Sequence, residues 1–104
     1  MKKSEVWWAN LPQPTKKRPV VILSRTTACA VRDSITVALV TSTIRGIPVE
    51  VSLDRSDGLS KNCVINLDTI ITIPKQLLTD FITTLSPDKV QQINAAIKFA
   101  LDIH

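Results

Sequence analysis

Three consecutive cations, Lys16, Lys17 and Arg18, stand directly before an apolar segment that begins at Pro19. Because a continuous apolar run is typical of a buried strand, we expect these charges at the rim of a sheet, held by a rigid element. A guanidinium donates two parallel hydrogen bonds to phosphate oxygens, and a lysine ammonium adds a point charge. The segment therefore indicates an anion-binding rim, with a solvated loop that opens a strand as the alternative.

A second polar cluster follows another apolar segment. Residues 34–41 are rich in β-branched side chains and predict a strand. Thr41, Ser42 and Thr43 place three hydroxyls where that strand ends, and Arg45 follows closely. Hydroxyls and a guanidinium together can bind the oxygens of a phosphate group. The alternative is the ordinary polar end of a strand.

Several kinds of catalytic site are excluded by what the sequence lacks. The only histidine is His104, the last residue, and there is no tyrosine. A two-histidine ribonuclease mechanism is therefore excluded, and a Ser-His-Asp triad would need the end of the final helix to reach the site. There is no His-Glu-x-x-His motif, no pair of carboxylates at metal-ligand spacing and no glycine-rich phosphate loop. Any chemistry must use Arg, Lys, Thr, Ser, Asp and backbone groups, and we expect no metal and no cofactor.

The composition predicts one small globular domain with a polyanionic partner. The 104 residues have the length of a single domain, so we assign residues 1–104 to one domain. The contents of 44% hydrophobic and 21% charged residues are ordinary globular values, and the formal net charge of +4 favours nucleic acid or an acidic peptide as partner. Cys29 and Cys63 form no redox or zinc motif, and no apolar run approaches the ~20 residues that span a bilayer. We expect a soluble, cytoplasmic protein with no membrane contact.

Hydrophobic patterns predict a mainly β fold that ends in one helix. The predicted strands cover residues 5–11, 19–24, 34–41 and 48–53, followed by 63–68 and 69–73, which make two short strands or one bent strand. Residues 75–85 mix helical and strand signals and predict a short helical turn followed by a strand. After the N-cap Ser86, a helix presents one apolar face, formed by Val90, Ile93, Ala96, Ile97, Ala100 and Leu101. The prediction is a small, strongly bent sheet or barrel closed by a C-terminal helix.

The ordered series of motifs resembles the MazF/PemK family of toxin endoribonucleases from bacterial toxin–antitoxin pairs. The resemblance covers nearly the whole chain and is carried by residues 5–8 (EVWW), 17–24 (KRPVVILS), 37–48 (VALVTSTIRGIP), 57–59 (DGL), 66–68 (NLD) and the final helix. It implies an SH3-like β-barrel of the CcdB/MazF/PemK type that forms a homodimer. It also implies sequence-specific cleavage of single-stranded RNA (mRNA, tRNA or rRNA), which inhibits translation, and a cognate antitoxin protein as partner.

The resemblance also implies a mechanism and its residues. In this family the ribose 2′-hydroxyl attacks the adjacent phosphate without a metal, which leaves a 2′,3′-cyclic phosphate and a 5′-hydroxyl. The family's key arginine falls on Arg18 and its key threonine on Thr41, with Ser42 beside it. An arginine is a poor proton donor, so we expect Arg18 to stabilise the extra negative charge of the transition state. The expected RNA-binding residues are Lys16, Lys17, Arg25, Arg45 and Asp68.

Two departures from the family pattern concern proton transfer. Residues 12–15 (PQPT) replace a longer loop that contains Gly-Ser-Glu-Gln, and they bring no carboxylate. Where some members carry Arg-x-Asp, this chain has Asn66, Leu67 and Asp68, which keeps the carboxylate and loses the cation. Asp68 is therefore a candidate general base, with hydrogen bonding to the backbone at a strand end as its alternative role.

The sequence leaves open the role of the two tryptophans and the choice between cleavage and binding. Trp7 and Trp8 point to opposite faces of a strand, so we expect one in the core and the other against the helix, a dimer partner or an RNA base. A toxin of the same fold that binds DNA gyrase, or a barrel that binds nucleic acid without cleaving it, would also suit the fold. Arg18 with Thr41 and Ser42 favours the nuclease, because a gyrase binder needs no phosphate-stabilising pair.

Overall fold

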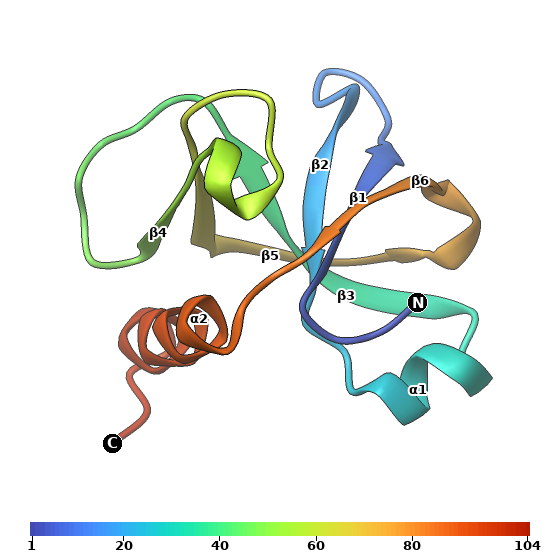
Figure 1. Ribbon diagram of the computed structural model, residues 1–104. Helices are drawn as coiled ribbons and strands as arrows, with labels where there is room; N and C mark the ends of the chain where they lie inside the picture. Colours follow the sequence, from blue (N-terminus) through green and yellow to red (C-terminus); the bar gives the residue numbers. More distant parts are fainter.

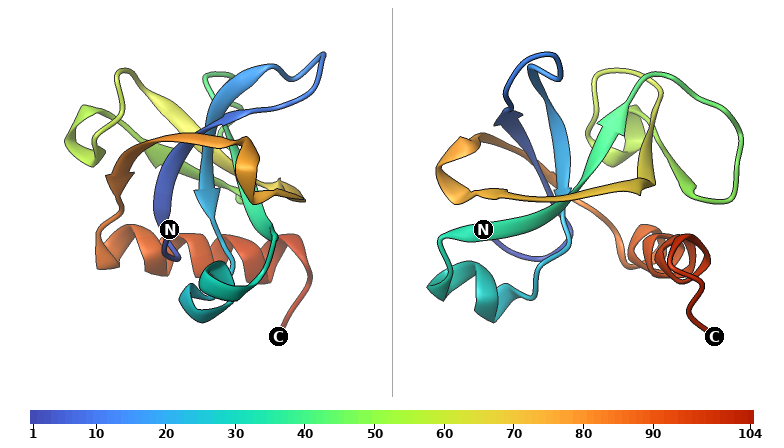
Figure 2. Two further views of the ribbon diagram at one scale, coloured as in Figure 1. Left: turned by 90° about the vertical axis from the view of Figure 1, so that its right-hand side faces the viewer. Right: turned by 180° about the vertical axis from the view of Figure 1, so that it is seen from behind.

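The computed structural model describes all residues, 1–104, and contains one six-stranded antiparallel sheet in the order β4-β5-β3-β2-β1-β6 (Figure 1). The strands are β1 (Glu5–Asn10), β2 (Lys17–Ile22), β3 (Ser34–Thr41), β4 (Glu50–Leu53), β5 (Cys63–Pro74) and β6 (Leu78–Thr84). The sheet curls strongly into a half-barrel, and helix α2 (Pro87–Ala100) packs against β4 and β5 (Figure 2). The predicted mainly β fold with a C-terminal helix is confirmed.

Strand β2 contributes side chains to both apolar cores of the molecule. Val21 belongs to the larger core, which also contains Ile93 and Ala96 of α2. Val20 and Ile22 belong to the smaller core, on the face that carries Cys29. Because successive side chains of a strand point to opposite faces, a strand buried on both faces reads as a continuous apolar run, as residues 19–24 do. This double burial anchors the polar residues at the start of β2.

Strand β5 is one long, bent strand rather than two short ones. Its pairing with β3 shifts between Ala38 and Leu39, whose partners are Ile70 and Asn66. The three residues between these partners, 67–69, have no partner on β3, so the strand bulges at this point. Residues 75–77 form a short 3-10 turn and β6 follows directly, as predicted from the mixed signals of residues 75–85.

The predicted C-terminal helix is confirmed, with one correction at its end. The Ser86 hydroxyl caps α2 by accepting a hydrogen bond from the backbone N–H of Lys89, and Pro87 occupies the first helical position. Ile93 and Ala96 are buried, but Leu101 lies beyond the last helical residue and is 58% exposed. Leu101 therefore does not belong to the packed face. The structure contains no helix with the length and hydropathy needed to cross a bilayer.

Two short helical segments were not predicted from the sequence. Helix α1 (Thr26–Val31) connects β2 to β3 and has no side-chain cap. The 3-10 turn η1 (Arg55–Asp57) follows β4 and is closed by two side-chain hydrogen bonds. The Asp54 carboxylate accepts from the backbone N–H of Ser56, and the Asp57 carboxylate accepts from the backbone N–H of Asp54. Gly58 ends this turn with a φ of 100°, a conformation that favours glycine. The chain then runs across one side of the candidate site before it enters β5.

Candidate functional site

The strand register brings together the two polar clusters at the ends of β2 and β3. Val20 pairs with Leu39 across these antiparallel strands. The paired register of β2 and β3 ends at this pair, and Arg18 and Thr41 lie two residues beyond it on their own strands, where both line the same two pockets. The backbone therefore holds the guanidinium and the hydroxyl next to each other.

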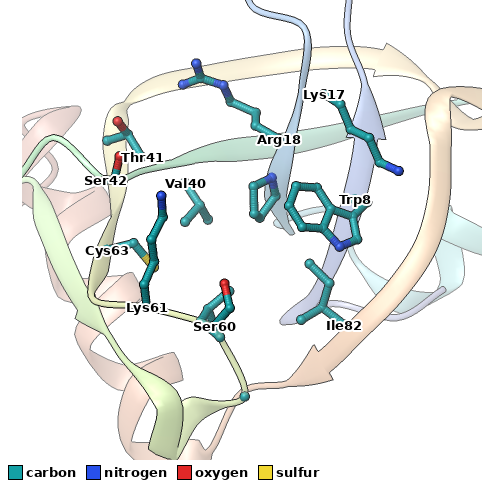
Figure 3. A pocket seen from close by; sticks show the side chains of 13 residues that line it. Trp8, Lys17, Arg18, Val40, Thr41, Ser42, Ser60, Lys61, Cys63 and Ile82 are labelled. Atoms are coloured by element: carbon teal, nitrogen blue, oxygen red, sulfur yellow. The ribbon is translucent and has the colours of Figure 1, made fainter.

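Arg18 and Thr41 line two neighbouring pockets. The first pocket has a volume of about 390 Å³, with an apolar part and a cationic rim (Figure 3). Its lining residues are Trp8, Lys17, Arg18, Pro19, Val40, Thr41, Ser42, Gly58, Leu59, Ser60, Lys61, Cys63 and Ile82. The second pocket is smaller and mainly polar, and is lined by Arg18, Leu39, Thr41, Thr43, Arg45, Asn66 and Thr69. The two pockets meet at the Arg18–Thr41 pair, so a chain molecule bound across both would pass over this pair.

The Arg18 side chain is half-buried and has no protein partner for its charge. It takes part in no ion pair, and its Nε atom is buried without a hydrogen-bond partner. Buried polar atoms in native proteins are nearly always hydrogen-bonded, so an exception calls for an explanation. A bound anion would provide one, because a guanidinium can donate to two oxygens at once.

The hydrogen bonds of Thr41 and Asn66 leave each of them with a free donor. The Thr41 hydroxyl oxygen accepts a hydrogen bond from the backbone N–H of Thr43 at 3.1 Å, so its own proton is free to be donated. The Asn66 side-chain oxygen accepts from the backbone N–H of Asp68 at 2.9 Å, which leaves its amide group free. Both residues line the second pocket, so this pocket offers neutral donors next to the Arg18 charge.

Cations dominate the charge around both pockets. The first pocket has Lys17, Arg18 and Lys61, the second has Arg18 and Arg45, and no carboxylate lines either one. The Lys17 ammonium lies 5.5 Å from the centre of the Trp8 ring and 3.8 Å from the Asp80 carboxylate. The pair of pockets is therefore suited to a polyanion rather than to a neutral ligand.

The two tryptophans lie on different sides of β1, and neither is fully buried. Trp8 lines the first pocket beside Lys17. Trp7 packs against the smaller core and stands edge to face with Phe81, with 5.9 Å between the two ring centres. Its indole N–H donates a hydrogen bond to the Glu5 carboxylate. We expected one tryptophan to fill the core, but Trp7 is only partly buried and covers the edge of the smaller core. The open face of Trp8 instead belongs to the candidate site.

Cys63 contributes a thiol to the apolar part of the first pocket. The residue is only 5% exposed, and burial raises the pKa of its thiol above the ordinary value. The nearby Lys61 ammonium acts in the opposite direction on this pKa but does not outweigh burial. Cys63 is therefore protonated at neutral pH and acts as a small apolar side chain rather than as a nucleophile.

The structure places most predicted site residues together and leaves three outside. Arg18, Thr41, Ser42, Lys17 and Arg45 line the two pockets. Lys16 lies in the β1–β2 turn with a φ of 62° and lines neither pocket. The other two are Arg25, which lines a separate pocket beside α1, and Asp68, which is exposed and lines neither of the two pockets.

Several lining residues were not predicted as site residues. Asn66 directly precedes the bulge in β5 and Thr69 is its last residue, and the bulge itself has no signal in the sequence. Ser60 and Lys61 follow η1 and reach the first pocket only through the folding of that loop. The Asp57-Gly58 pair predicts a turn at this point. It does not predict which surface of the protein the turn packs against.

This arrangement can bind a phosphodiester and stabilise added negative charge on it. Arg18 offers a fork of donors, Thr41 and Asn66 offer neutral donors, and Trp8 offers an aromatic surface against which a base can stack. No group of three or more His, Cys, Asp or Glu side chains is arranged to hold a metal ion.

Comparison with known proteins identifies the family. Residues 2–101 match the model of the PemK-like, MazF-like toxin of type II toxin–antitoxin systems. The chain is 33% identical over 101 residues to the probable endoribonuclease MazF5 of Mycobacterium tuberculosis, covering 96% of this chain and 92% of that protein. It is 36% identical over 90 residues to the endoribonuclease MazF of Staphylococcus saprophyticus, covering 84% and 75% of the two chains.

Solved structures show the same relationship. The Mycobacterium tuberculosis toxin MazF-mt6 superposes with a TM-score of 0.90 at 33% identity, covering 96% of this chain and 98% of that one. A mycobacterial endoribonuclease in complex with its cognate antitoxin superposes with a TM-score of 0.88 at 25% identity, covering 100% and 97%. The chain therefore belongs to the family of PemK-like, MazF-like toxins of type II toxin–antitoxin systems.

Proposed function

We propose that the protein is a sequence-specific endoribonuclease that cleaves single-stranded RNA without a metal and so inhibits translation. The observation that carries this proposal is the Arg18–Thr41 pair, which lies where two cationic pockets meet and has no anionic partner within the chain. An RNA strand laid across both pockets would place one phosphate at this pair. The names of the related proteins, which describe endoribonucleases, support the same activity.

In the proposed reaction, the ribose 2′-hydroxyl gives its proton to water and attacks the adjacent phosphorus. The bond to the 5′-oxygen of the next nucleotide breaks, and that oxygen takes a proton from water. The products are a 2′,3′-cyclic phosphate and a 5′-hydroxyl. Charge builds up on the non-bridging oxygens in the transition state, where Arg18 donates two hydrogen bonds and Thr41 donates one. No carboxylate or imidazole lines the pockets, so the lining side chains contribute binding and charge stabilisation rather than proton transfer by such groups.

The proposed partners follow from the same charges. A cognate antitoxin with an acidic segment would compete with RNA for the two pockets, because both ligands use the same cations. Both should bind more weakly as the salt concentration rises. An antitoxin peptide that binds tightly without slowing cleavage would contradict this shared site.

We also propose that the protein is a homodimer. Phe99, Leu101 and Ile103 near the end of the chain are 61%, 58% and 51% exposed, which leaves an apolar surface for a second copy. Dimerisation would also enlarge the small core of a chain of this size. Light scattering at micromolar concentration should give twice the 11.5 kDa of one chain, and a monomer mass would contradict the proposal.

The proposed activity is tested with purified protein and single-stranded RNA in excess chelator. We expect cleavage at a limited set of sequences, with cyclic phosphate and 5′-hydroxyl ends identified by mass spectrometry. Cleavage that stops in chelator, or that leaves 5′-phosphate ends, would contradict the proposed mechanism. Inhibition of DNA gyrase with intact RNA would instead favour a toxin of the same fold that acts by binding.

A further inference from the structure

Lys61 is a cation of the first pocket that comes from outside the Arg18–Thr41 strand pair. It follows η1 and projects from residues 58–61 into the pocket that Arg18, Thr41 and Ser42 also line (Figure 3). The pocket therefore has two cations on β2, Lys17 and Arg18, and a third, Lys61, on the loop that precedes β5. The inference drawn from this position rests on the proposed function as a ribonuclease.

The loop that carries Lys61 is held in place on three sides. Its turn is closed by the Asp57 carboxylate, which accepts a hydrogen bond from the backbone of Asp54, and by the Asp54 carboxylate, which accepts one from the backbone of Ser56. Gly58 packs so closely on β6 that a Cβ atom at this position would lie 2.6 Å from the Thr83 hydroxyl oxygen. On the third side, Lys89 of α2 lies 3.9 Å from the Asp57 carboxylate. The backbone that presents Lys61 is therefore anchored to β4, β6 and α2.

The Lys61 ammonium has no partner within the chain. Its side chain is exposed and makes no hydrogen bond or ion pair, whereas Lys17, on the same pocket, is close to both Trp8 and Asp80. The nearest carboxylate in sequence, Asp57, is engaged by Lys89. An unpaired cation on an anchored loop, facing a pocket without carboxylates, is suited to an anion supplied by a ligand.

We propose that Lys61 binds a second phosphate of the RNA strand, next to the phosphate held by Arg18 and Thr41. Two cations on different walls of one pocket suit a ligand with several negative charges, and an RNA strand carries one per nucleotide. Holding a second phosphate fixes the strand on one side of the scissile bond, so Lys61 acts as a positioning residue for the reaction. The apolar part of the pocket, with Trp8, is then left for the base between the two phosphates.

The test compares Lys61→Gln with Lys61→Arg and with Lys98→Gln. Lys98 is a control lysine that is exposed on α2 and makes no side-chain hydrogen bond or ion pair. RNA that carries a 2′-deoxyribose at the cleavage position reports binding without cleavage. For Lys61→Gln, we expect the slope of log Kd against log salt to become less steep by about 0.7, the value for one phosphate contact on a single strand. Lys61→Arg should keep the wild-type slope. Lys98→Gln should match the wild type as well.

A second measurement locates the phosphate that Lys61 binds. Single uncharged methylphosphonate linkages are introduced one at a time along the RNA. When the methylphosphonate stands at one particular linkage beside the scissile one, the cleavage rate of wild-type protein should fall about 10- to 100-fold. Lys61→Gln should show the same fall in rate on unmodified RNA. The methylphosphonate at that linkage should then lower the rate of Lys61→Gln no further. An equal effect of the modified linkages on wild type and Lys61→Gln would overturn the proposal.

The outcomes for Lys61 and for the proposed function are separate. Cleavage of all-ribose RNA by the wild type reports the proposed function. If the wild type cleaves and Lys61→Gln behaves like Lys98→Gln in slope and rate, only the Lys61 site is wrong. If the wild type binds RNA without cleaving it, the ribonuclease proposal is wrong, and the salt slope still decides whether Lys61 contacts a phosphate.

Discussion

The Lys89 ammonium on α2 lies 3.9 Å from the Asp57 carboxylate at the end of η1. The same nitrogen atom donates a hydrogen bond to the Ser52 carbonyl oxygen at 2.6 Å. The two side chains are only 20% and 11% exposed, so solvent screens their interaction less than that of a surface pair. Because Asp57 directly precedes residues 58–61, this contact connects the C-terminal helix to one wall of the first pocket.

Lys89→Ala should destabilise the protein and lower its activity together. The substitution leaves the Asp57 carboxylate and the Ser52 carbonyl without their partner, which costs about 1–3 kcal/mol in the free energy of unfolding. Without this contact, residues 58–61 are held less firmly at the first pocket. The cleavage rate should therefore fall several-fold at temperatures where the variant is fully folded. Denaturant unfolding and single-turnover cleavage measure the two effects. Lys98 lies on the same helix and makes no side-chain hydrogen bond or ion pair, so Lys98→Ala should change neither quantity. A Lys89→Ala variant as stable as wild type would show that the Lys89–Asp57 contact is not formed.

The Cys63 thiol reports whether RNA occupies the first pocket. Because burial raises its pKa, alkylation by iodoacetamide should be slow at neutral pH and should accelerate only as the pH passes the ordinary thiol value of about 8.5. Uncleavable RNA should slow the alkylation of Cys63 further, as measured by peptide mass spectrometry. Cys29 lies in the other core, away from the pocket, and serves as the internal control. Protection of both thiols to the same degree, or of neither, would argue against RNA in this pocket.

Asp54 should make the stability of the protein sensitive to acid. The hydrogen bonds from the Ser56 hydroxyl and backbone N–H lower the pKa of the Asp54 carboxyl below its ordinary value of about 3.9. The folded state therefore favours the ionised form, and this contribution is present above the unfolded pKa and is lost as the pH falls through the folded one. The stability difference between wild type and Asp54→Ala, followed by thermal unfolding from pH 6 to pH 3, should shrink below about pH 4. A difference that is constant across this range would contradict the assignment.

The sequence predicts the strands that are buried on one or both faces. The bounds predicted for residues 34–41 coincide with β3, because β-branched side chains on a packed strand give a strong local signal. The sequence of α1, TTACAV, carries no helix signal, because it is short and uncapped and its Thr and Val residues have a local preference against helix. Its position between two buried strands, where Ala28 and Cys29 can pack, overrides that preference.

The candidate site was only partly predictable, because some of its residues reach it through contacts between segments that are distant in the sequence. Arg18 and Thr41 stand at the ends of predicted strands, so their polar character was visible against the apolar runs. Lys61 and Asn66 reach the pockets through a folded loop and a bulged register, which depend on contacts between distant segments. Asp68 was expected at the site, but the bulge brings Asn66 to the pocket and leaves Asp68 exposed.

In the proposed mechanism, Arg18 and Thr41 act together on the scissile phosphate. Arg18→Ala should lower the single-turnover cleavage rate by about a hundred- to thousandfold, the usual cost of one preorganised donor to a charged transition state. Thr41→Ala should cost less, because a neutral hydroxyl makes a weaker hydrogen bond. Arg18→Lys should restore little activity, because a single ammonium cannot replace the fork of donors.

The most direct measurement is the rate of RNA cleavage by wild type, Arg18→Ala and Arg32→Ala under single-turnover conditions in excess chelator. Arg32 is an exposed arginine beside α1 that lines neither of the two pockets, so its substitution controls for the loss of one positive charge. We expect near wild-type cleavage by Arg32→Ala, a loss of about a hundredfold or more for Arg18→Ala, and the same circular dichroism spectrum for all three proteins. Cleavage by a folded Arg18→Ala variant at the wild-type rate would contradict the proposed role of Arg18 at the scissile phosphate.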